Sequence, residues 1–109
     1  MTKLLLSVLL AANAMPAMAD PLYAFVDKHR NEAATRAYVA GVGAGLQVGG
    51  VLSQSPQNQL YCPPLALAIQ ADQYLAIADD YVRKHGPQDP LGFPQVLAFG
   101  LRETFPCSR

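Results

Sequence analysis

The clearest periodic pattern of apolar and polar positions lies in the segment 65–85. Its apolar positions recur with the i, i+3, i+4, i+7 spacing of one helical face: Tyr74, Ile77, Ala78 and Tyr81. Its charged positions fall on the opposite side: Asp72, Asp79, Asp80 and Arg83. The segment is predicted to be a helix that ends at His85-Gly86-Pro87, with ion pairs Asp79–Arg83 and Asp80–Lys84 four residues apart.

Three further segments have helical patterns. The segment 32–48 is rich in alanine, and it carries an apolar stripe every four residues at Tyr38, Val42 and Leu46, before Gly49-Gly50 is expected to end it. The segment 22–30 is long enough for one or two helical turns, and 94–104 begins with a proline suited to a first turn. Since no strand-like alternation occurs, the chain is predicted to be all-α, a small bundle of three to four helices.

Three alternate glycines, Gly41, Gly43 and Gly45, interrupt the helix predicted over 32–48. Each costs about 1 kcal/mol of helix propensity relative to alanine, so we expect a close helix–helix approach to compensate. A dinucleotide-binding loop would need a third glycine where Leu46 stands, and a preceding strand. Helix packing is therefore the favoured interpretation.

The first nineteen residues have the pattern of a secretory signal peptide. Lys3 precedes an apolar run over 4–12, and Ala17-Met18-Ala19 supplies the small residues of a cleavage site. A membrane anchor would need about 20 apolar residues, roughly twice this run. We expect a signal peptide over 1–19 and a single exported domain over 20–109, in a bacterial periplasm and free of the membrane after cleavage.

Composition narrows the classes of function. The 109 residues allow one small domain, and eight basic against eight acidic residues leave no net charge to attract nucleic acid. Only two histidines and two cysteines are present, which is too few for a dedicated Cys/His metal site. We expect no metal, no cofactor and no nucleic-acid partner.

Cys62 and Cys107 form an isolated pair in a chain expected to enter an oxidising compartment. Such a pair predicts a disulfide, and closing a loop of about 45 residues would stabilise the fold by ~4 kcal/mol. The alternative, a redox-active or nucleophilic cysteine, lacks a C-x-x-C motif.

Candidate catalytic groups do not form a recognisable constellation. His29 and His85 have no nucleophile nearby in sequence, and His85 suits the end of a helix, where a donor to the last carbonyls stabilises it. Asp79 and Asp80 are adjacent in a helix and diverge by about 100°, so a solvated face is expected rather than an acid–base pair. The chain is predicted not to be an enzyme.

The connection 86–93 combines turn residues with large apolar ones. Leu91 and Phe93 must either pack under the fold or face a partner, and the prolines reduce the entropy lost on docking. We hypothesise that the connection recognises a partner protein. The residues assigned to this recognition are Gln88, Asp89, Leu91 and Phe93. The alternative, that Leu91 and Phe93 cap the core, stays open.

A series of spaced motifs resembles the Rap/Tai family of type VI secretion immunity proteins. The motifs are Tyr38-x-x-Gly41-x-x-x-Gly45, Tyr61-Cys62-x-Pro64, Gln73, Tyr81-Val82-x-x-His85 and Leu101-x-x-x-Phe105-Pro106-Cys107. Thr35 stands where many members carry a cysteine, and Gly86 makes the His–Pro motif one residue longer.

The resemblance implies a function as well as a helical fold. Members of this family are small exported proteins, often homodimeric, that neutralise peptidoglycan-cleaving amidase effectors. By resemblance, we expect this chain to bind such an amidase and block its active site, with a homodimer as a further implied state. The alternative from another class is a small structural or acid-stress chaperone-like protein of the periplasm, which the scarcity of histidines disfavours.

Overall fold

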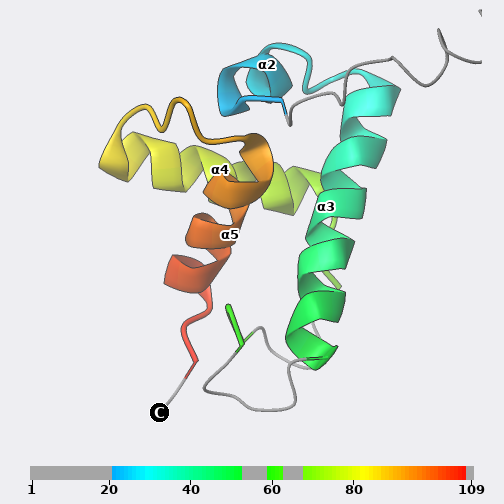
Figure 1. Cartoon of the computed structure of the whole chain (residues 1–109). Coiled ribbons are helices and arrows are strands. Elements are labelled where there is room, and N and C mark those ends of the chain that lie inside the picture. The colour runs from blue at the N-terminus through cyan, green and yellow to red at the C-terminus, as the bar shows by residue number, and fades with distance from the viewer. Residues whose placement is uncertain (1–20, 53–58, 63–67, 108–109) are drawn as a thin grey trace, which may run out of the picture.

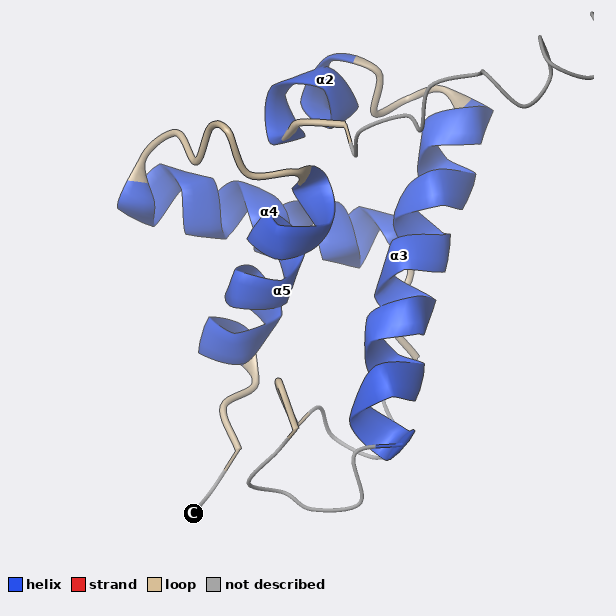
Figure 2. Ribbon diagram, in the orientation of Figure 1, coloured by secondary structure: helices blue, strands red, loops and turns tan. Residues whose placement is uncertain are grey.

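The computed structural model describes residues 21–52, 59–62 and 68–107, and in these residues the chain forms four helices and no named strand (Figures 1 and 2). The helices are α2 (Tyr23–Lys28), α3 (Ala33–Leu52), α4 (Ala71–His85) and α5 (Phe93–Thr104). The all-α prediction is therefore confirmed. The signal peptide expected over 1–19 lies outside the described residues.

The helix predicted over 65–85 begins at Ala71 in the structure. The side chain of Gln70 accepts from the backbone of Gln73, and the side chain of Gln73 accepts from the Gln70 backbone N–H at 2.7 Å. This reciprocal capping satisfies N–H groups that a first helical turn leaves unpaired. At the other end the helix stops as expected at Gly86, whose φ of 82° is costly for residues with a Cβ.

The helix predicted over 32–48 is longer than expected, since α3 continues through Gly49-Gly50 to Leu52. The prediction that these glycines end it is wrong. Glycine lowers helix propensity, but it keeps its backbone N–H and adopts helical dihedral angles, so it weakens a helix without terminating it. In Figure 1, α3 stands beside the crossed pair formed by α4 and α5.

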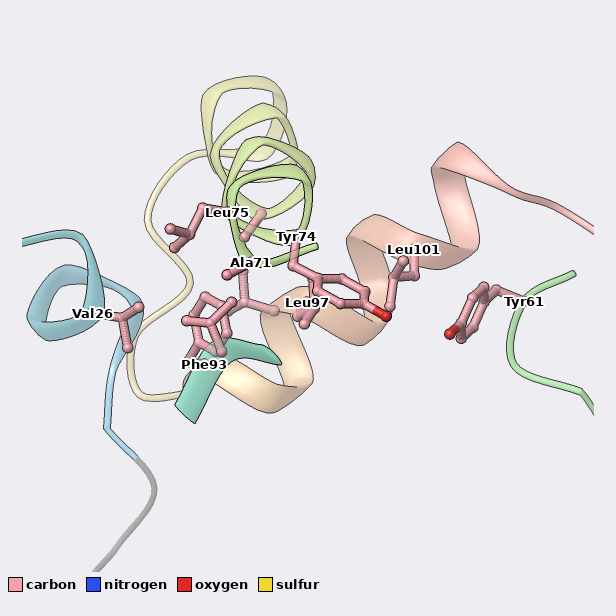
Figure 3. Packing of buried hydrophobic residues seen from close by; sticks show 11 residues of the cluster. Val26, Tyr61, Ala71, Tyr74, Leu75, Phe93, Leu97 and Leu101 are labelled. Carbon is pink, nitrogen blue, oxygen red and sulfur yellow. The ribbon is translucent and has the colours of Figure 1, made fainter. Parts of the chain in front are cut away.

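The core lies where α5 packs on α4, with α3 and α2 closing its sides. It consists of Val26, Val39, Tyr61, Ala71, Tyr74, Leu75, Ala78, Phe93, Val96, Leu97 and Leu101. Figure 3 shows Val26 at one end of this cluster and Tyr61 at the other, with Phe93 and Leu97 between them. Among the described side chains, no polar or charged one is buried apart from the tyrosines of this cluster.

The face that α3 turns to the core differs slightly from the predicted stripe. Val39 and Gly43 are buried, whereas Tyr38, Val42 and Leu46 are half-buried around them. A Cβ added at Gly43 would clash with the ring of Tyr74, so this glycine permits the close approach of α3 to α4. A close helix–helix contact thus compensates for the lower helix propensity at Gly43, as expected. Gly41 and Gly45 make no such contact, because an added Cβ would have no described neighbour within 4 Å.

The predicted disulfide is present and joins Cys62 to Cys107. Beside it, the backbone N–H of Cys62 donates to the carbonyl of Phe105 at 2.9 Å. The segment before α4 is therefore fixed to the segment after α5. Within the part of the chain that is described, no helix has both the length and the hydropathy needed to cross a membrane.

Candidate functional site

The predicted recognition segment forms the loop 86–92 between the end of α4 and the start of α5. The side-chain amide of Gln88 donates to the carbonyl of Gly86 at 2.9 Å, and the backbone N–H of Leu91 donates to the carbonyl of Gln88 at 2.8 Å. An antiparallel bridge between Leu22 and Gly92 fixes the far end of the loop beside α2. The loop is thus held by its own hydrogen bonds and by α2.

The four residues assigned to recognition have three different environments. Asp89 is exposed, and Gln88 and Leu91 are half-buried. Phe93 is 0 % exposed and belongs to the core, which is the alternative left open for it by the sequence. Phe93 is the first residue of α5, and its backbone N–H donates to the carbonyl of Pro21 at 2.7 Å. Its side chain therefore cannot contact a partner, and it is withdrawn from the predicted site.

Asp89 differs from the other described carboxylates in its electrostatic surroundings. Asp27, Asp72, Asp79 and Asp80 form ion pairs with lysine or arginine, and Glu32 and Glu103 each contact a histidine ring nitrogen. Asp89 forms no ion pair with any described residue, although it lies only four residues beyond His85, which pairs with Glu103 at 2.6 Å. The loop consequently presents an uncompensated negative charge to solvent.

A cavity of about 200 Å³ lies between the loop, α2 and the facing sides of α4 and α5. Its walls are mostly apolar. The apolar and aromatic side chains come from α2, α4, the loop and α5: Tyr23, Ala24, Val82, Leu91 and Val96. Gln88, Asp89 and Pro87 of the loop complete the lining. The cavity therefore brings three predicted residues together with side chains from three helices.

A cluster of polar side chains anchors α2 beside this cavity. The Tyr23 hydroxyl donates to Asp79 Oδ1 at 2.6 Å, and Arg30 donates to the same oxygen at 2.7 Å and to Asp27 at 2.5 Å. Burial, and then the hydrogen bond to Asp79, raises the pKa of Tyr23. The bond to Asp79 likewise raises the pKa of Arg30. The phenol and guanidinium keep their protons, so the cluster is a structural link between α2 and α4.

This cluster corrects the expected role of Asp79. The predicted ion pair Asp79–Arg83 does not form, because Asp79 is half-buried under α2 and bonds to Arg30. Arg83 pairs with Asp80 instead. The predicted pair Asp80–Lys84 is present at 3.0 Å, and the hydrogen bond from Lys84 lowers the pKa of Asp80.

Sequence reasoning missed the contribution of α2. The segment 22–30 is short and weakly periodic, so nothing in it indicated that Tyr23 and Ala24 would line a cavity against a loop some 60 residues later. Phe25 of α2 is 56 % exposed, and Leu22, the residue before this helix, is 37 % exposed, so two large apolar side chains face solvent. An exposed aromatic residue of this kind is detectable only once the packing is known.

The site combines apolar surface with an exposed acidic group. The apolar cavity and the exposed carboxylate of Asp89 lie within one small region. Over the described ranges, no three His, Cys, Asp or Glu side chains gather in a group that could hold a metal ion. Comparisons of the chain with protein-family models, with curated proteins and with solved structures found no match.

Proposed function

We propose that the chain is an exported periplasmic immunity protein that binds a peptidoglycan amidase effector of type VI secretion and blocks its active site. It acts by binding and carries out no catalysis of its own. The spaced motifs that resemble the Rap/Tai family support this assignment. The disulfide is consistent with an oxidising compartment such as the periplasm.

The observation that carries the proposal is the form of the loop 86–92. It is braced by the hydrogen bonds of Gln88 and Leu91, it presents Asp89 without an ion-pair partner among the described residues, and it borders an apolar cavity. A braced loop loses little conformational entropy on docking, so more of the contact energy is retained as affinity. This combination is better suited to recognising another protein than to a purely structural role.

The test starts from the tagged full chain, expressed for export and purified under oxidising conditions. It is used to capture proteins from the secreted and periplasmic fractions of the bacterium that encodes it, and each captured hydrolase is assayed on purified peptidoglycan. We expect one amidase to be recovered in a one-to-one complex and to lose its activity. An amidase that stays fully active in the complex contradicts the proposal, and recovery of many unfolded proteins favours the chaperone-like alternative.

A matched pair of variants locates the contact. Asp89→Ala removes the exposed carboxylate of the loop, and we expect it to weaken inhibition of the amidase at least fivefold. The control is Asp72→Ala, which removes an exposed carboxylate at the opposite end of α4. Equal inhibition by both variants and by the unaltered protein would exclude the Asp89 carboxylate from the recognition site.

A further inference from the structure

The cavity beside the loop 86–92 has the size of one amino-acid side chain. An apolar cavity of about 150 Å³ is large enough to hold a benzene-sized group. The present cavity, at about 200 Å³, therefore has room for one leucine, methionine or phenylalanine side chain. It lies at the surface, next to the exposed Asp89, so a side chain carried by another molecule can enter it.

The lining has almost no free polar group to offer a polar ligand. The Tyr23 hydroxyl is bonded to Asp79, and the Gln88 amide is bonded to the carbonyl of Gly86. Apart from Asp89 at its edge, the remaining walls are formed by alanine, valine, leucine and proline side chains. A polar group placed inside would lose its hydrogen bonds to water without replacement, which favours an apolar occupant.

The charge beside the cavity indicates what surrounds that occupant. Asp89 lines the cavity, is exposed and has no ion-pair partner among the residues described. A lysine or arginine adjacent to the inserted side chain would pair with it, and such complementarity fixes orientation and speeds association. On the α2 side, the exposed Leu22 is joined to Gly92 of the loop by a backbone bridge.

We propose that this cavity is the anchor pocket for the partner enzyme, and that it takes one apolar side chain of that enzyme flanked by a lysine or arginine. The inference rests on the proposed function, because it takes the amidase as the molecule that carries the side chain. In this arrangement the immunity protein receives a residue of the enzyme. Anchors of this kind, fully desolvated in a pocket, supply most of the affinity of many interfaces.

The decisive variant fills the pocket from inside. Ala24 lines the cavity from the exposed side of α2, and Ala24→Leu places the variant's own apolar side chain there. Leucine keeps the helix propensity of alanine almost unchanged, so the fold is retained. The control is Ala76→Leu, the same change at an exposed position of α4 that does not line the cavity.

We expect Ala24→Leu to weaken inhibition of the captured amidase at least tenfold, and Ala76→Leu to change it less than twofold. Asp89→Asn should weaken it three- to tenfold and reduce its dependence on salt concentration. If Ala24→Leu inhibits as well as the unaltered protein, the pocket is not the anchor, while the immunity function stands. If the unaltered protein inhibits no amidase, the proposed function fails instead.

A second measurement examines the pocket without any enzyme. The probe is 3-methylbutylamine, which joins a branched apolar group to a cation, and its binding is followed by NMR chemical shifts. We expect saturable shifts at about millimolar probe, confined to signals of Val82, Leu91 and their neighbours, and abolished by Ala24→Leu. Shifts that are absent, or spread over the surface of the unaltered protein, would overturn the inference.

Discussion

Tyr61 is only 2 % exposed, and its hydroxyl has no hydrogen-bond partner among the described residues. A buried hydroxyl left unpaired costs about 1–3 kcal/mol. Burial also raises the pKa of Tyr61 to about 12, above the ordinary value for tyrosine. This residue therefore stabilises the core through its ring and weakens it through its oxygen.

The variant Tyr61→Phe separates the two effects. We expect it to increase the free energy of unfolding by about 1 kcal/mol at pH 7, because the ring stays and the unpaired oxygen is removed. Tyr23→Phe is the matched control, since the Tyr23 hydroxyl donates to Asp79, and it should lose about 1–2 kcal/mol. Urea unfolding of both variants measures the difference. A clear loss of stability in Tyr61→Phe would contradict the conclusion that the Tyr61 hydroxyl is buried without a hydrogen-bond partner in the described part of the chain.

The raised pKa of Tyr61 also makes the free energy of unfolding depend on pH. Because the pKa is raised in the folded state, the contribution of the neutral phenol is complete below the unfolded pKa of about 10. This contribution is lost as the pH rises from about 10 to about 12, because in this range Tyr61 is deprotonated in the unfolded chain but still protonated in the folded one. Tyr61→Phe should therefore flatten part of the alkaline decline in unfolding free energy, which urea titrations between pH 8 and pH 11 will detect.

At the scale of elements, the contact between α3 and α4 depends on a single glycine. We expect Gly43→Ala to lower the free energy of unfolding by about 1–2 kcal/mol. The added methyl group clashes with the Tyr74 ring, and the cost of this clash exceeds the gain in helix propensity from glycine to alanine. Gly45→Ala, where an added Cβ has no neighbour within 4 Å, should instead gain up to about 1 kcal/mol. Thermal melts of the pair test the contrast, and equal shifts of both variants would exclude this close contact.

The existence and type of the helices could be predicted from the sequence, while some of their ends could not. The periodic residues from Tyr74 to Tyr81 identify α4, but its start at Ala71 depends on a capping arrangement of two glutamines, which are weak capping residues in any sequence pattern. The predicted end of α3 at Gly49-Gly50 comes too early, because these glycines reduce helix propensity only modestly. Tertiary packing determines where such helices begin and end more than the helix propensity of the individual residues does.

The candidate site was predictable only as far as one segment contributes to it. Proline, glycine and the apolar Leu91 in a single connection indicated the loop, and the structure places Leu91 beside a cavity. The sequence could not separate Leu91 from Phe93, since both are large apolar residues two positions apart, yet only Phe93 enters the core. The α2 wall of the cavity depends on a tertiary contact, for which no local pattern exists.

At the scale of the whole molecule, stability depends strongly on one covalent link. The disulfide joins residues 45 positions apart, so the chain-entropy model gives it ~4 kcal/mol, against a typical total of ~5–15 kcal/mol for a domain. We expect the double variant Cys62→Ala/Cys107→Ala to lose about this amount in urea unfolding, and reduction by dithiothreitol to reproduce the loss. A change below about 1 kcal/mol would show that the noncovalent core suffices.

The same link closes residues 62–107 into a covalent ring. The ring runs from Cys62 through α4, the loop 86–92 and α5 to Cys107. A protease that nicked the exposed stretch at Asp89-Pro90 would therefore release no fragment, because both new ends stay tied to one another through the sulfur bridge. A single backbone cut in the loop 86–92 would in this way leave the protein as one covalently linked molecule.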